Sequence, residues 1–196
     1  MKKLSVIAIL FATIMAMGCG GKKDKAKIEY ISTPTIEAVD STLYGNCGEG
    51  TSMNSLELLT DSGDTVVCSI EEASAKGEVK GGLMAGDRMA VVVTVDANSE
   101  RAALSVVNIN TLLGRWANLD RSFELMSDGS VVSNVKEPHP YTSWRMLNGK
   151  LLLSADTFEI RTLGPDSLLL YGGNGLTGYR RLAANAQNAA NVSARH

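Results

Sequence analysis

Apolar and polar positions alternate in short stretches through most of the chain, and this pattern predicts an all-β protein. Between residues 41 and 183, apolar runs of about four to eight residues recur, with Gly, Asp and Asn at the breaks between them. Long helical periodicity is absent before the tail. We interpret the runs as two small β-domains, at residues 41–110 and 111–183.

The first set of runs predicts five strands bounded by Gly and Asp turns. A three-strand meander is followed by a connection at residues 71–82, and Gly86-Asp87 then leads into the fourth strand. This order resembles an OB-fold, which implies a small five-stranded barrel. The connection is poor in apolar residues, which disfavours the helix that many OB-folds carry there. The expected strands lie at residues 43–47, 56–58, 65–70, 89–95 and 102–109.

The second set contains the clearest turn signals of the chain. Asp128-Gly129 and Asn148-Gly149 each separate two alternating apolar runs, which is the strongest short-range signal for a hairpin. Further Gly-containing turns follow at residues 164–166 and 172–175. Eight short antiparallel strands in hairpin order predict an up-and-down barrel. They are expected at residues 114–118, 121–127, 130–135, 141–147, 150–154, 157–163, 167–171 and 177–182.

Motifs within this second set resemble the lipocalin family. Gly114-Arg115-Trp116 looks like the Gly-x-Trp that opens the first lipocalin strand, and Tyr179-Arg180-Arg181-Leu182 resembles a closing strand. The ensemble is similar to the lipocalin-like domains of Bacteroidetes lipoproteins, which implies a compact lipocalin-like barrel. The strands are shorter than in typical lipocalins, and side chains can fill the interior of an eight-stranded barrel. The motifs between them are Phe123-x-Leu125-x-x-Asp128-Gly129, Tyr141-x-x-Trp144, Leu151-x-Leu153 and Phe158-x-Ile160-x-x-Leu163-x-x-Asp166-x-Leu168-x-Leu170.

The same resemblance implies that a basic residue of the last strand packs on Trp116. First and last strands pair in a closed up-and-down barrel, which removes the sheet edges. Neighbouring residues of a strand point to opposite faces, so Arg180 shares a face with Leu182 and Arg181 does not. If Leu182 points inward, Arg180 is the residue buried against Trp116. We therefore expect Trp116 and Arg180 to close the barrel.

The first residues of the chain have the features of a bacterial secretory signal. Lys2 and Lys3 precede an apolar stretch at residues 4–17, which is too short to span a bilayer comfortably. Ala16-Met17-Gly18-Cys19 resembles the lipobox of bacterial lipoproteins, which implies lipidation of Cys19 and cleavage before it. An ordinary signal peptide with an incidental Cys is the alternative.

Lipidation of Cys19 makes the membrane the first expected partner of the chain. We expect a signal peptide at residues 1–18, a lipid-anchored linker at 19–40 and a disordered tail at 184–196. Gly20 stands where many proteobacterial lipoproteins of the inner membrane carry Asp, so we expect the outer membrane. Whether the protein faces the periplasm or the outside stays open.

Charge argues against nucleic acid as a partner. Loss of Lys2 and Lys3 with the signal peptide lowers the basic side chains from 19 to 17, against 21 acidic ones. A chain that binds nucleic acid needs Lys and Arg to displace counterions, and no basic cluster lies in the expected domains. Tyr44 is the only aromatic residue at 41–110, so the stacking platform of a nucleic-acid-binding OB-fold is missing.

Two cysteines remain after Cys19. An oxidising periplasm favours a disulfide between Cys47 and Cys68. If they lie on strands one and three of a meander, however, the intervening strand holds them about 9–10 Å apart. Disulfides need Cα atoms within about 7 Å. We therefore favour buried free thiols, with the disulfide as the alternative.

The sequence predicts no catalytic constellation. His139 lies between two prolines and no Gly-x-Ser-x-Gly motif is present, so we interpret this histidine as structural or solvent-facing. Asp61, Asp64, Glu71 and Glu72 form an acidic patch, but the first two are ordinary turn residues. A metal site needs several convergent ligands. We expect no enzymatic activity, no cofactor and no metal.

The expected function is a non-enzymatic binding module for a small apolar ligand. Tyr141 and Trp144 are three apart in an expected strand and point to opposite faces, so one should enter the core and the other should line a surface or mouth. With Tyr171 they are the candidate ligand-binding residues, and the alternative is that Trp116 and Trp144 are only core anchors. The alternative is a structural or assembly lipoprotein that contacts another envelope protein. A deep cavity lined by Leu and Trp would favour the first function. A filled barrel beside an exposed apolar patch would favour the second.

Overall fold

A computed structural model describes residues 39–95, 98–133 and 139–183, which belong to one compact unit. The predicted signal peptide, the expected lipidation site Cys19, nearly all of the linker and the predicted tail lie outside these residues. Within the described ranges, no helix has the length and the apolar character needed to cross a membrane.

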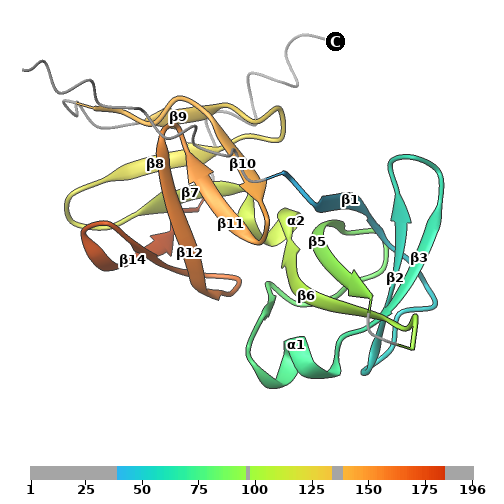
Figure 1. Cartoon of the computed structure of the whole chain (residues 1–196). Coiled ribbons are helices and arrows are strands. Elements are labelled where there is room, and N and C mark those ends of the chain that lie inside the picture. The colour runs from blue at the N-terminus through green and yellow to red at the C-terminus, as the bar shows by residue number, and fades with distance from the viewer. Residues whose placement is uncertain (1–38, 96–97, 134–138, 184–196) are drawn as a thin grey trace, which may run out of the picture. The chain divides into compact units, whose positions relative to one another are not determined.

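The first domain is a six-stranded mixed sheet with the strand order β3-β2-β1-β5-β6-β4. A parallel pairing of β3 with β6 joins five of these strands into a ring, so the predicted OB-like five-stranded barrel is confirmed (Figure 1). Leu56 and Leu58 point inward and Glu57 outward, as strand alternation requires. The elements are β1 (Thr42–Cys47), β2 (Ser55–Thr60), β3 (Thr65–Ser69), α1 (Glu71–Ala75), β4 (Val79–Lys80), β5 (Arg88–Val95) and β6 (Arg101–Asn108).

The connection after β3 differs from its prediction. It carries the short helix α1, which buries Ala73, and the two-residue strand β4, which pairs in parallel with β6. A helix of five residues completes little more than one turn, so it leaves no repeating apolar stripe in the sequence. The expectation that this connection lacks a helix was therefore wrong.

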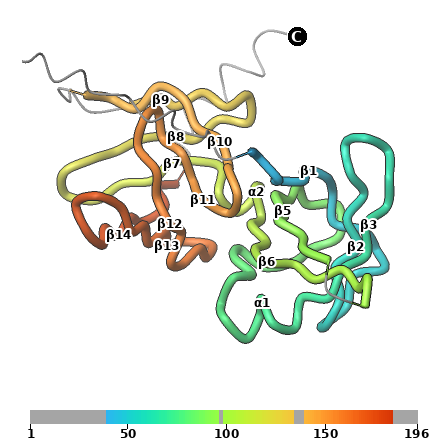
Figure 2. Tube along the Cα trace, viewed as in Figure 1, coloured from blue at the N-terminus to red at the C-terminus, as the bar shows by residue number. Residues whose placement is uncertain are grey.

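The second domain is an eight-stranded antiparallel sheet that curls into a nearly closed up-and-down barrel. Its strand order is β10-β11-β12-β13-β14-β7-β8-β9, and Figure 2 follows the chain through it from β7 to β14. The free edges of β9 and β10 meet at the bridge between Ser130 and Ser143. The elements are β7 (Gly114–Ala117), β8 (Ser122–Leu125), β9 (Val131–Ser133), β10 (Trp144–Leu147), β11 (Lys150–Leu153), β12 (Asp156–Leu163), β13 (Ser167–Gly172) and β14 (Gly175–Arg181).

Large side chains fill the interior of this barrel. Inward and outward residues alternate along most of the strands, with a bulge between Ile160 and Thr162 of β12, and the bulkiest inward side chains have essentially no exposed surface. Burial of each such side chain contributes about 1.5–3 kcal/mol to folding. The prediction of an all-β chain whose second domain is a compact, eight-stranded antiparallel up-and-down barrel is confirmed. The most deeply buried residues are Trp116, Phe123, Leu125, Met146, Leu151, Leu153, Leu168 and Leu170.

One end of the barrel is covered by the first domain and by the short helix α2 (Ile109–Leu112) that joins the two sheets. The Tyr44 hydroxyl donates to the carbonyl of Met146 at 3.1 Å, and the Gly81 amide donates to the carbonyl of Leu163 at 3.1 Å. Ala90 and Val107 of the first sheet belong to the same apolar cluster as the barrel interior. We call this the closed end.

The two cysteines are buried and free, which confirms the favoured interpretation. Cys47 lies opposite Leu58 of β2, and Cys68 lies opposite Leu56 of the same strand. β2 therefore stands between them, as the meander predicted. Burial raises the pKa of the Cys68 thiol.

Candidate functional site

The seam between the first and last barrel strands is built around Trp116. β14 pairs with β7, and Trp116, with no exposed surface, lies opposite Arg181. The Arg181 guanidinium carbon lies 4.2 Å from the centre of the indole. Arg180 is exposed and lies opposite Ala117. The expectation that Arg180 packs on Trp116 was therefore wrong by one residue.

The physical reason is the orientation of Leu182. The prediction depended on Leu182 pointing inward, but Leu182 follows the last residue of β14 and is 40% exposed. Tyr179 is the residue of β14 that points into the barrel, and Arg181 shares its face.

Arg181 and Trp116 have structural roles at the closed end. The Arg181 guanidinium donates to the carbonyls of Leu113 at 2.7 Å and of Thr111, and its Nε donates to the carbonyl of Pro165. Burial lowers the pKa of Arg181. The Trp116 indole N–H donates to the carbonyl of Leu112 at 2.8 Å. The bonds to Thr111, Leu112 and Leu113 satisfy carbonyls at the end of α2, where intrahelical partners are missing, and the bond to Pro165 ties the β12–β13 turn to β14.

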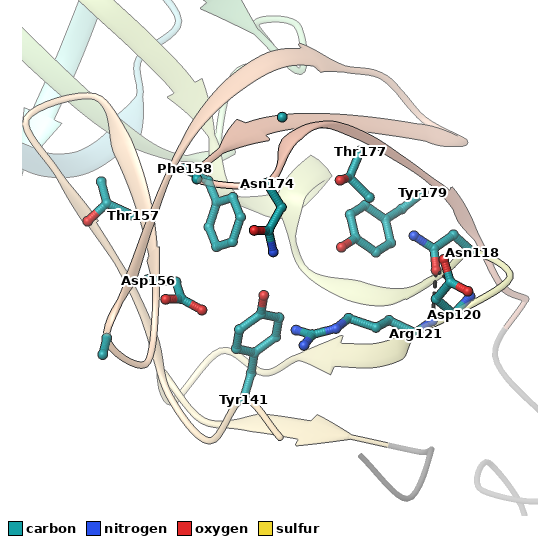
Figure 3. A pocket seen from close by; sticks show the side chains of 13 residues that line it. Asn118, Asp120, Arg121, Tyr141, Asp156, Thr157, Phe158, Asn174, Thr177 and Tyr179 are labelled. Carbon is teal, nitrogen blue, oxygen red and sulfur yellow. Dashed lines mark hydrogen bonds between the residues drawn. The ribbon is translucent and has the colours of Figure 1, made fainter. Parts of the chain in front are cut away.

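The opposite end of the barrel holds a pocket of about 500 Å³ (Figure 3). Every second connection of an up-and-down barrel lies at the same end, so several loops that are distant in sequence meet here. They are the β7–β8 loop, the segment before β10, the β11–β12 turn and the β13–β14 turn. We call this end the mouth. The pocket is lined by Asn118, Asp120, Arg121, Tyr141, Ala155, Asp156, Thr157, Phe158, Gly173, Asn174, Gly175, Thr177 and Tyr179.

A cluster of aromatic rings forms the floor of the mouth pocket. The ring of Phe123 makes edge contacts with Tyr179, at a centroid distance of 5.1 Å, and with Tyr141, at 5.8 Å. Tyr141 in turn contacts Phe158 at 6.2 Å. Such edge-to-face pairs contribute about 0.5–1.5 kcal/mol beyond area burial. The rings therefore hold both tyrosines in fixed orientations.

Polar groups converge above this floor. Figure 3 shows the hydroxyls of Tyr141 and Tyr179, the Asn174 amide and the Asp156 carboxylate directed toward the middle of the pocket. The Arg121 guanidinium carbon lies 4.7 Å from the centre of the Tyr141 ring.

The loop that carries Arg121 is held by Asn118. The Asn118 side-chain oxygen accepts the backbone N–H groups of Asp120 at 2.9 Å and of Arg121 at 2.7 Å. Asx turns of this kind fix the local backbone. The loop therefore presents Arg121 to the pocket from a defined position.

The structure separates the three predicted ligand-binding residues. Tyr141 is buried and lines the mouth pocket. Trp144 is half-buried outside the lining, and its indole N–H donates to the carbonyl of Met126 at 2.7 Å. Tyr171 is 47% exposed, with the Arg161 guanidinium carbon 5.1 Å from its ring centre. Of the three candidates, only Tyr141 therefore lines the mouth pocket; the inward positions of β13, the strand of Tyr171, belong to its leucines.

The sequence interpretation missed most of the mouth. Arg121, Asp156 and Asn174 lie in or beside turns, where no periodicity marks a face. Tyr179 lies in a predicted strand, but the direction of its side chain depended on the orientation of Leu182. Alternate turns of the predicted barrel share one end, and this topology was the only signal that pointed to the mouth.

A second hollow, of about 680 Å³, lies on the outer surface over β13, β14 and β7. Leu119 is fully exposed beside it, and Leu182 is partly exposed. Gly178 has no side chain to cover this surface, so the flank of Leu169 lines the hollow. We call this hollow the outer groove.

The described surroundings of His139 and of the acidic patch do not indicate a catalytic or metal site. His139 is exposed. Asp61 forms an ion pair with Arg88, and this hydrogen-bonded contact lowers the pKa of the Asp61 carboxyl. Within the described ranges, no three His, Cys, Asp or Glu side chains gather as a metal site would require.

Comparison of the chain with models of protein families, with curated proteins and with solved structures finds no match. The barrel architecture and the buried aromatic cluster are compatible with a binding module. The case for a function therefore depends on the geometry of the mouth.

Proposed function

We propose that this chain is a lipid-anchored protein of the bacterial cell envelope whose second barrel is a non-enzymatic binding module. The observation that carries the proposal is the mouth pocket, with polar side chains converging over an aromatic floor. Its volume of about 500 Å³ lies within the range of about 300–1,000 Å³ typical of small-molecule sites, which favour barrel mouths. The resemblance of Gly114-Arg115-Trp116 to a lipocalin opening strand supports the same class of protein.

The pocket supports a polar ligand in place of the apolar one suggested by the sequence. Leu151, Leu153 and Met146 fill the interior below it, so the described side chains close the barrel beneath the mouth. The groups that face the pocket are a guanidinium, carboxylates, amides and hydroxyls.

The described lining also supports binding without catalysis. It contains no His, Cys, Ser or Lys, the residues most often used as nucleophile or base. Asp120 and Asp156 are both exposed, whereas a carboxylic acid that serves as a general acid sits in an apolar, water-poor surrounding.

The anchor part of the proposal depends on Cys19. A Cys19→Ser variant is expected to lose lipidation and to move from the membrane fraction to the soluble fraction, because acyl chains provide the attachment. Intact-mass analysis of the wild-type protein from outer membranes tests this directly. An unmodified Cys19 on the mature wild-type chain would contradict the proposal.

The binding part is tested by nuclear magnetic resonance on the purified full chain. We expect titration with a mixed set of small polar molecules to shift amide signals of the β7–β8 loop and the β13–β14 turn. Saturable shifts confined to the outer groove would refute the mouth as the ligand site.

The outer groove favours a second function, a structural or assembly protein that contacts another envelope protein. A filled barrel with exposed leucines beside it is the arrangement that such a protein would show. Leu119→Asp together with Leu182→Asp should then abolish co-purification of the partner from cross-linked envelopes. Loss of co-purification in this variant, with an unchanged mouth titration, would favour the second function over the first.

A further inference from the structure

We propose that the mouth pocket takes a neutral polyhydroxylated ligand, a short saccharide. This inference rests on the proposed function, because it names the ligand class for the same pocket. Two properties of the lining carry it: it contains both hydrogen-bond donors and acceptors, and its net charge disfavours anions while Arg121 covers the Tyr141 face that a cation would use.

The hydrogen-bonding groups of the pocket match hydroxyl groups. Each sugar hydroxyl donates one hydrogen bond and accepts others, so a saccharide needs both kinds of partner. Arg121 supplies donors only, and Asp156 supplies acceptors only. Asn174, Thr177 and Tyr179 each supply both kinds.

The charges of the lining disfavour ionic ligands. The lining contains two carboxylates, those of Asp120 and Asp156, and a single guanidinium, that of Arg121, so it carries a net negative charge that repels an anion. An organic cation would bind best over an aromatic face. The face of Tyr141 already has Arg121 over it, at 4.7 Å. A neutral ligand meets neither obstacle.

The aromatic floor suits the carbon face of a sugar ring. Phe158 is half-buried and offers an apolar surface at the pocket wall. Tyr141 and Tyr179 combine an apolar ring with a polar tip, as a saccharide combines C–H and O–H surfaces. A purely apolar ligand would remove water from the Asp156 carboxylate and the Asn174 amide without offering them hydrogen bonds, at a cost in affinity.

The pocket is held in place before any ligand arrives. Tyr141 and Tyr179 are buried and contact Phe123, and Arg121 follows the turn fixed by Asn118. Preorganised groups lose little side-chain entropy on binding, which favours recognition of a weakly binding polar molecule.

The test titrates the full chain with maltotriose, cellotriose and mannotriose. Laurate, citrate and spermidine serve as apolar, anionic and cationic probes of the same pocket. We expect at least one trisaccharide to shift the amide signals of residues 118–121 and 173–177 in a saturable manner, and laurate, citrate and spermidine to leave these signals in place.

Two variants connect binding to the lining. Thr177→Val and Asn174→Ala each remove hydrogen-bonding groups from the pocket and should lower the association constant about three- to tenfold. The matched control is Thr162→Val, which makes the same chemical change on the outer surface and should leave affinity unchanged. Thermal melts of all three variants verify that the fold is retained.

The possible outcomes distinguish failure of the saccharide class from failure of the proposed binding module. Binding of laurate, citrate or spermidine at the mouth without any trisaccharide overturns the saccharide class and leaves the binding module standing. Trisaccharide binding that Thr177→Val and Asn174→Ala do not weaken overturns the mouth as the site. If none of the six probes shifts the mouth signals, both the ligand class and the proposed module are rejected.

Discussion

The two ends of the second barrel each place an arginine over an aromatic ring, and they use the pair differently. At the closed end, Arg181 lies 4.2 Å from the Trp116 ring centre and donates to carbonyls of its own chain. At the mouth, Arg121 lies 4.7 Å from the Tyr141 ring centre and borders a pocket of about 500 Å³.

The comparison shows that an arginine over an aromatic ring does not by itself indicate whether the pair stabilises the fold or borders a ligand site. Arg181 acts as a structural cap because its donors point at backbone carbonyls at the end of α2. Arg121 belongs to a candidate ligand site because the groups around it face open space. The surroundings of each pair decide its role, and they lead to different predicted costs of substitution.

The largest effect is expected from Trp116→Ala. Removal of a fully buried Trp leaves a cavity at the seam and should lower the free energy of unfolding by about 3–5 kcal/mol. Urea denaturation followed by circular dichroism measures this change. Trp144→Ala, at a half-buried position, is the matched control and should cost clearly less. Equal losses in the free energy of unfolding for the two variants would show that Trp116 contributes no more to stability than Trp144.

Arg181→Met should have the next largest effect. The substitution keeps the approximate length of the side chain but removes its charged hydrogen bonds, and the partial exposure of the guanidinium limits the expected total loss to about 1.5–3 kcal/mol. Arg180→Met, one residue earlier and exposed, should stay within about 0.5 kcal/mol of the wild type. Similar urea midpoints for the two variants would show that the closed end does not depend on Arg181.

A glycine at each end sharpens the comparison further. Gly114 has a φ of +112°, and a Cβ there would lie 2.8 Å from the Arg181 guanidinium. Gly114→Ala should therefore cost about 1–3 kcal/mol through backbone strain. Gly173→Ala at the mouth meets nothing within 4 Å and should change stability by less than about 0.5 kcal/mol. Thermal melts that rank the two in the opposite order would contradict a tight closed end and an open mouth.

The smallest effect is expected from Arg121→Met. A partly exposed cation–aromatic contact contributes about 0.5–1 kcal/mol, so the urea midpoint should fall only slightly. A loss as large as that of Arg181→Met would mean that Arg121 is also a structural cap. The comparison between the two ends would then fail.

The two barrels could be predicted because their signals are local. Asp128-Gly129 and Asn148-Gly149 mark hairpins within a few residues, and alternation marks the strands between them. The wrong choice of Arg180, in place of Arg181, as the residue that packs on Trp116 had a different cause. Strand alternation gives two possible faces, and the choice depended on Leu182, which lies just beyond β14 and points outward.

The mouth pocket was beyond prediction from local patterns. Arg121, Asp156 and Asn174 are brought together only when the barrel closes, and turn residues carry no alternation that would show their direction. Tyr141 could be selected because an aromatic residue within an expected strand is a candidate for a core or a site. Trp144 and Tyr171 satisfied the same reasoning and lie elsewhere.

The pairing of β7 with β14 also has a consequence for folding kinetics. The hairpins of this barrel join neighbouring segments, whereas the seam joins Trp116 to Arg181, near the two ends of the domain sequence. Contacts between distant residues require a larger loss of chain entropy before they yield stabilisation, and they slow folding. We expect the hairpins to form first and the seam last. The contacts of Arg181 would then form after the rate-limiting barrier, where they slow unfolding more than they speed folding.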